Sequence, residues 1–167
     1  MNAGDLLRRV RGMFLERPQN FGWFEDGIAA SGRPVNRSQL KYVRSRGVDA
    51  VLSLTEEPLP RELLEGLGLD YHHVPMRNHA MPSEEGLLKA VRVIRDLRSG
   101  GKRVLVHCAA GKGRTGTVLA AYLMATRDLS AEEAIALVRG VRRGAIEAVQ
   151  EEGLKSIERS IKGVLMS

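Results

Sequence analysis

The ten residues 107–116 combine a nucleophile with the means to hold an anion. They read His107-Cys108-Ala109-Ala110-Gly111-Lys112-Gly113-Arg114-Thr115-Gly116. An apolar stretch typical of a strand, 104–106, precedes them, and one typical of a helix, 118–124, follows. The free N–H groups and the dipole at a helix start attract an oxyanion, and the same field favours a thiolate over a thiol. Cys108, the only cysteine of the chain, is therefore predicted to be a nucleophile beside an anion-binding loop, which indicates phosphoryl transfer to sulfur.

The other residues of this loop suit distinct tasks in that chemistry. Its glycines allow consecutive backbone N–H groups to turn inward, and the planar fork of Arg114 can grip two phosphate oxygens. The Thr115 hydroxyl can hydrogen-bond the Cys108 sulfur, and His107 can orient the loop through backbone hydrogen bonds. We therefore expect Cys108, Arg114, Thr115 and His107 to be catalytic, and the phosphate to be bound by Ala109, Ala110, Gly111, Lys112, Gly113 and Arg114.

The sequence His-Cys-x5-Arg-Thr-Gly resembles the signature of cysteine-based protein tyrosine phosphatases. The chain is similar in size to the small atypical members of the dual-specificity subgroup, and the resemblance runs from about Asn20 to Glu158. It is carried outside the loop by segments 20–23, 47–55, 71–75, 81–83 and 142–150. The resemblance implies a phosphatase that forms a phosphocysteine intermediate.

The resemblance also implies a general acid in the segment 74–83, where the family carries an aspartate, but this chain has Asn78 at that position. Asparagine can hydrogen-bond the leaving oxygen but cannot donate a full proton. Three alternatives stay open. His79 is the acid, or is merely an exposed loop residue. Glu147 is the acid or orients water, or merely complements a helix dipole. Otherwise no side chain protonates the leaving group, and aryl phosphates are then the best substrates.

Composition bounds the class of protein. A chain of 167 residues suits one domain. It has no run of about 20 apolar residues, no apolar signal core and no Cys/His cluster with metal-ligand spacing. A single cysteine suits a reducing cytosol. We therefore expect a cytoplasmic, monomeric enzyme without a membrane span, metal or cofactor. The net charge of +6 favours anionic substrates, while an aromatic content of 4% gives no reason to expect a nucleic-acid partner.

The hydrophobic pattern alternates between strands and helices. It predicts strands at 21–24, 27–30, 49–54, 71–74 and 103–106, a short helix from Pro60, and helices at 4–16, 36–46, 83–98, 113–126, 130–139 and 146–164. This pattern indicates an α/β fold with a central, mostly parallel or mixed sheet of four to five strands flanked by helices, as in protein tyrosine phosphatases. We expect an N-terminal helix or extension at 1–19 and a dual-specificity phosphatase catalytic domain at 20–167.

The leading hypothesis is a metal-independent protein phosphatase for phosphotyrosine, with phosphoserine and phosphothreonine as further substrates left open. Its partner would be a phosphorylated protein or peptide. A first alternative is a phosphoinositide or inositol-phosphate phosphatase, because Lys112 resembles a loop lysine of tensin-like lipid phosphatases. That resemblance is incomplete, since position 109 is alanine where those enzymes carry a second lysine. An alternative of another class, suggested by Asn78, is a phosphate-binding module without turnover.

Overall fold

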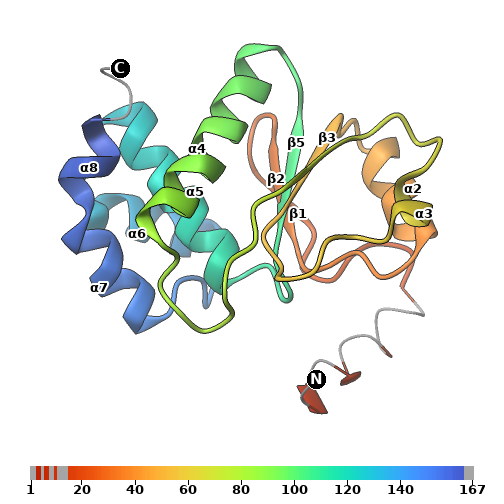
Figure 1. The fold of residues 1–167 in the computed structure, drawn as a ribbon, viewed down its shortest axis with the longest axis horizontal. Coiled ribbons are helices and arrows are strands. Elements are labelled where there is room, and N and C mark those ends of the chain that lie inside the picture. Colours follow the sequence, from red (N-terminus) through yellow and green to blue (C-terminus); the bar gives the residue numbers. More distant parts are fainter. Residues whose placement is uncertain (1–2, 5, 8–9, 11–14, 164–167) are drawn as a thin grey trace.

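A five-stranded sheet lies between two layers of helices (Figure 1). The computed structural model describes residues 3–4, 6–7, 10 and 15–163. The strands are β1 (Gly22–Glu25), β2 (Ile28–Ser31), β3 (Ala50–Ser53), β4 (Asp70–His73) and β5 (Val104–His107). The helices are α2 (Arg37–Ser45), α3 (Arg61–Leu64), α4 (Glu84–Ser99), α5 (Gly113–Arg127), α6 (Ala131–Val141), α7 (Ala148–Ser156) and α8 (Glu158–Gly163).

The sheet has the order β1-β2-β5-β3-β4, with β1 antiparallel to β2 and the other neighbours parallel. Strand β5 lies at the centre of the sheet, and its side chains pack alternately into two cores on opposite faces. Val104 and Val106 belong to the core on the side of α4–α8, whereas Leu105 belongs to the core on the side of α2 and α3. A strand covered on both faces reads as a continuous apolar run. The predicted mixed α/β architecture is confirmed.

Local signals explain where the helices begin. The Ser83 hydroxyl accepts a hydrogen bond from the backbone N–H of Gly86 and so caps α4, and Ser130 forms a reciprocal capping box with Glu133 at the start of α6. Helix α5 differs because most of its residues are buried. It therefore anchors the residues at its N-terminus to the core of the molecule.

The structure departs from the predicted elements mainly at the two ends of the chain. The long terminal helix is divided into α7 and α8, which flank Ile157, and its predicted end at Val164 lies outside the described residues. Of the predicted helix 4–16, residues 4, 6–7 and 10 are helical and residues 15–16 are not, and Leu6, Leu7 and Val10 are exposed. The rest of that segment up to residue 14 lies outside the described residues.

Candidate active site

The site is built where parallel strands end together. Ser53 at the end of β3 pairs in register with His107 at the end of β5 and with His73 at the end of β4. The segments that follow these strands therefore leave from the same edge of the sheet, where open α/β sheets bind ligands. The loop after β5 carries Cys108, and α5 begins at Gly113. The N-cap residue Lys112 makes no side-chain cap hydrogen bond to α5.

Cys108 is nearly buried, with an exposed fraction of 3%, and its surroundings favour the thiolate. Burial raises the pKa of the thiol, but the hydroxyl and backbone N–H of Thr115, the charge of Arg114 and the backbone N–H of Gly111 outweigh burial. The pKa of Cys108 therefore lies below its ordinary value. The Thr115 hydroxyl is itself buried and has no other hydrogen-bond partner within the described chain, so it is available to the sulfur.

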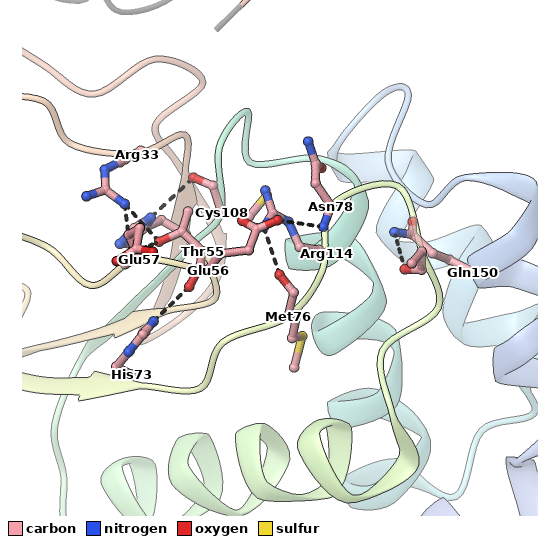
Figure 2. A network of polar contacts seen from close by, with 12 residues as sticks. Arg33, Thr55, Glu56, Glu57, His73, Met76, Asn78, Cys108, Arg114 and Gln150 are labelled. Carbon is pink, nitrogen blue, oxygen red and sulfur yellow. Dashed lines mark hydrogen bonds and ion pairs between the residues drawn. The ribbon is translucent and has the colours of Figure 1, made fainter. Parts of the chain in front are cut away.

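Arg114 is the largest of the fully buried side chains, and only part of its guanidinium is occupied. Its Nη1 donates to Glu56 Oε2 at 2.7 Å and to the carbonyl of Met76 at 3.0 Å (Figure 2). Its Nε has no hydrogen-bond partner within the described residues. A buried donor without a partner is costly. An incoming phosphate oxygen would satisfy it, as the sequence-based role of Arg114 requires.

His107 is fully buried behind the loop. Burial lowers the pKa of His107 to about 3, so its ring is neutral at physiological pH. The neutral ring donates from Nδ1 to the carbonyl of Cys108 at 3.2 Å, and its Nε2 accepts from the hydroxyl of Ser53. This geometry agrees with the expectation that His107 orients the loop through its backbone.

The segment after β4 contains Asn78, which stands at the family's acid position, and His79, one of the two candidate acids. The backbone N–H of Asn78 donates to Glu56 Oε1 at 2.9 Å, and its side-chain amide makes no hydrogen bond within the described part of the chain. His79 lies next to it and has a left-handed backbone, with φ of 54°. Nδ1 of His79 lies 2.9 Å from Glu147 Oε1, so two residues treated above as rival acids contact each other directly.

Glu147 reaches the mouth of the phosphate-binding loop from the other side. A Cβ built on Gly113 would lie 3.2 Å from Glu147 Oε1. The preceding residue, Ile146, has a φ of 62°, a conformation that β-branched residues rarely adopt. Two contacts hold this strained residue: its carbonyl accepts from Nη2 of Arg139 at 2.8 Å, and its side chain packs against Gly116 of α5.

Three further residues border the site, and sequence reasoning gave none of them a role. Glu56 follows β3, and its only sequence signal is its position just beyond the end of a buried strand. Gln150 is fully buried on α7 and donates to the carbonyl of Ala80 at 3.3 Å. Arg142 donates to the carbonyl of Gly111. Arg142 and Gln150 both lie in the segment 142–150, one of the segments that carry the family resemblance.

The loop residues Ala109 and Ala110 are partly exposed, and Lys112 is exposed. A Cβ built on Gly144 would lie 3.8 Å from Nζ of Lys112, so this ammonium group lies between the phosphate-binding loop and the loop before α7. Among the described residues, no three His, Cys, Asp or Glu side chains form a group that could hold a metal ion. None of the described helices is both long and apolar enough to cross a membrane.

Comparison with known proteins places the chain in a family. Residues 18–154 match the family model described as "PTP-SAK: Swiss Army Knife protein, DSP-PTPase phosphatase domain". The chain belongs to this family of dual-specificity-like phosphatase domains within the cysteine-based protein tyrosine phosphatase superfamily. The match confirms the predicted phosphatase class, a phosphoric monoester hydrolase.

Individual relatives agree with this class. The dual specificity protein phosphatase Mpk3 of Drosophila melanogaster is 32% identical over 68% of this chain and 28% of its own length. The phosphatidylglycerophosphate phosphatase PTPMT1 of Arabidopsis thaliana is 33% identical over 63% of this chain and 32% of its own. This chain therefore spans about a third or less of these curated relatives. The solved structure of Tk-PTP in the active form is 38% identical, with a TM-score of 0.76, and the match covers 83% of this chain and 96% of that one.

Proposed function

We propose that this protein hydrolyses phosphotyrosine in proteins or peptides, without a metal ion, through a phosphocysteine intermediate. Phosphoserine and phosphothreonine remain further substrates to be tested. The observation that supports this proposal best is the pairing of Cys108, whose pKa is lowered, with Arg114, whose buried Nε has no partner. A module that only bound phosphate would have no need of an activated thiolate, which argues against the non-catalytic alternative.

In the first step, the Cys108 thiolate attacks phosphorus in line with the ester bond. An S–P bond forms, the P–O bond to the leaving group breaks, and the leaving oxygen takes up a proton. In the second step, water attacks the phosphocysteine, inorganic phosphate leaves and the thiolate is regenerated. Arg114 and the inward N–H groups of the loop stabilise the charge on the equatorial oxygens in both steps. The Thr115 hydroxyl stabilises the sulfur as a leaving group.

We assign the proton of the first step to Glu147, with His79 as the residue that positions its carboxyl group. Their contact of 2.9 Å and the distance from Glu147 to the Gly113 position support this assignment. The strained backbone at Ile146 supports it as well, because such conformations gather at functional sites. Asn78 then supplies its backbone N–H to Glu56 rather than a catalytic side chain.

The second candidate substrate class is an inositol phosphate or phosphoinositide. Lys112 of the loop and Arg143, which follows the loop-bound Arg142, are exposed and make no ion pair within the described residues, so they could meet further phosphate groups. A structure of PTPMT1 has been solved in complex with PI(5)P, at 23% identity to this chain. That likeness supports the shared fold only. The argument for an inositol-phosphate substrate rests on the positive charges of Lys112 and Arg143.

Hydrolysis of para-nitrophenyl phosphate in the presence of EDTA tests the chemistry. We expect turnover by the wild type and none by Cys108→Ser, which should still bind inorganic phosphate. Hydrolysis by Cys108→Ser, or none by either protein between pH 4 and 8, would contradict the proposal, and the latter result would favour a phosphate-binding module. A phosphotyrosine peptide and inositol phosphates, compared on wild type and Lys112→Ala, then separate the substrate classes. Only polyphosphorylated substrates should lose kcat/KM in Lys112→Ala.

A further inference from the structure

Three consecutive carbonyl groups of the phosphate-binding loop are each held from outside the loop. The carbonyl of Ala109 accepts from the backbone N–H of Arg33 at 3.1 Å. The carbonyl of Ala110 accepts from Nδ2 of Asn20 at 2.8 Å. The carbonyl of Gly111 accepts two bonds from Arg142, at 3.1 Å from Nε and 2.7 Å from Nη2. Only the last two involve side chains, so only these can be removed by substitution.

Holding a carbonyl outward fixes the direction of an N–H group, because the C=O and N–H of a trans peptide point in opposite directions. The carbonyl held by Asn20 and the N–H of Gly111 belong to one peptide unit. This N–H is among the groups that lower the pKa of Cys108. The carbonyl held by Arg142 belongs to the next unit, whose N–H is that of Lys112. Both side chains therefore act on peptide units that line the anion site.

Asn20 and Arg142 also hold each other. Nη2 of Arg142 donates to the carbonyl of Asn20 at 3.0 Å, and Asn20 has a left-handed backbone with φ of 56°. The two residues are 122 positions apart in the chain. We call this pair the loop clasp. It joins the segment before β1 and the segment after α6 to two neighbouring carbonyl groups of the loop.

At Gly111 the loop lies directly against the end of β2. Gly111 has a φ of 72°, and a Cβ there would lie 2.4 Å from the carbonyl carbon of Ser31. Arg142, for its part, makes no ion pair with a carboxylate within the described chain, so its charge is available to the loop. Burial lowers the pKa of Arg142, while the charge of the Cys108 thiolate acts in the opposite direction, because the two charges attract each other.

We propose that Arg142 and Asn20 are positioning residues that keep the two peptide units 110–111 and 111–112 with their N–H groups inward. They thereby promote the thiolate form of Cys108 and strengthen oxyanion binding without touching the substrate. The inference rests on the proposed function for its meaning, since the loop must bind phosphate and Cys108 must be the nucleophile. Beyond that function, the proposal assigns to two residues outside the signature the task of holding the loop in its oxyanion-binding conformation.

Alkylation of Cys108 tests the proposal without requiring turnover. The rate of reaction with iodoacetamide as a function of pH gives the pKa of this single cysteine, and protection by orthovanadate gives an oxyanion affinity. In Arg142→Met we expect the pKa to rise by about one pH unit and the vanadate affinity to fall about tenfold or more, as for a lost bond to a charged donor. Arg142→Lys, which keeps the charge, should recover part of both. Asn20→Gly, which keeps the left-handed backbone, should shift both in the same direction by less.

Arg139 provides a matched control. It too caps two carbonyls, those of Ala145 and Ile146, but it does not touch the phosphate-binding loop. Arg139→Met should leave the Cys108 pKa and vanadate affinity unchanged, whatever it does to turnover. The proposal would be overturned if Arg142→Met left the Cys108 pKa unchanged and the vanadate affinity within twofold of wild type. Equal shifts of both quantities in Arg139→Met would overturn it as well. If Arg142→Met does not fold, Asn20→Gly decides by the same criteria. If the wild type is alkylated as expected but hydrolyses no aryl phosphate, the proposed function is refuted. The positioning role of Arg142 and Asn20 is then still supported by the alkylation and vanadate results.

Discussion

Oε2 of Glu56 lies 2.7 Å from Nη1 of Arg114, and the other oxygen of the same carboxylate accepts the backbone N–H of Asn78. One carboxylate therefore joins the arginine of the phosphate-binding loop to the segment in which the family carries its acid. Partial burial raises the pKa of Glu56, but hydrogen bonds from its own backbone N–H, from that of Asn78 and from Arg114 outweigh burial and lower it. Glu56 is therefore ionised at neutral pH.

Glu56→Gln should lower kcat/KM about three- to thirtyfold for an aryl phosphate, because a charge-assisted bond to the arginine is replaced by a neutral one. This loss should persist from pH 8 down to about pH 5, because the lowered pKa of Glu56 keeps its carboxylate ionised over that range, and it should fade only as the pH falls through that lowered pKa. Steady-state rates between pH 4 and 8 provide the measurement. The neighbouring Glu57→Gln is the control, because the Glu57 side chain is exposed and makes no hydrogen bond or ion pair within the described residues. Equal effects at both positions would refute the role given to Glu56.

Glu147→Gln should reveal the general acid through the leaving group. Loss of general acid catalysis costs about 10²–10⁴-fold for a poor leaving group and much less for a good one. We therefore expect a large loss of kcat with an alkyl phosphate, a small loss with para-nitrophenyl phosphate, and loss of the basic limb of the pH–rate profile. His79→Ala should give a smaller change of the same kind. An unaltered basic limb in both variants would favour an enzyme without a side-chain acid.

His107→Asn should change how stability depends on pH. The folded protein holds His107 neutral with a pKa of about 3, whereas an unfolded chain protonates this residue near 6.5. Between these values the unfolded state binds the extra proton, so lowering the pH destabilises the wild type by about 1.4 kcal/mol per pH unit through this residue. Urea unfolding at pH 6.5 and pH 5 measures the effect. The variant should lose less stability across this interval than the wild type does, and equal losses would contradict the burial argument.

Gly116→Ala should disturb the site from within α5. The new Cβ would lie 2.9 Å from Cβ of Ala145 and 3.0 Å from Cγ1 of Ile146, so the segment before Glu147 must move. Overpacking costs about 1–3 kcal/mol, against a gain of up to about 1 kcal/mol in helix propensity. Gly140→Ala on α6 is the matched control, since nothing lies within 4 Å of its Cβ position. We expect Gly140→Ala to be stabilised in urea unfolding, and Gly116→Ala to be destabilised and to lose activity on alkyl phosphates. Full activity in Gly116→Ala would show that the conformation of Ile146 does not matter for catalysis.

The nucleophile loop could be predicted from sequence because its chemistry and its structure lie in adjacent residues. Cys108, Arg114 and Thr115 are placed by one strand end and one helix start, both visible as apolar runs. Glu56 could not be predicted in the same way, because its bond to Arg114 spans 58 positions and depends on β3 pairing with β5. The contact between His79 and Glu147 spans 68 positions and was hidden for the same reason. Strand order, rather than local pattern, brings these pairs together.

The bonds that hold the phosphate-binding loop at positions 109–111 end on main-chain carbonyl oxygens. The side chains of Ala109 and Ala110 take no part in them. Gly111, pressed against Ser31, admits no replacement. The loop thus holds two kinds of position: Gly111, where a side chain would collide with the backbone of Ser31, and Ala109 and Ala110, whose partly exposed side chains make none of the bonds that hold the loop. A library of small and polar residues at 109 and 110 is therefore the natural place to begin redesigning which phosphoesters this protein accepts.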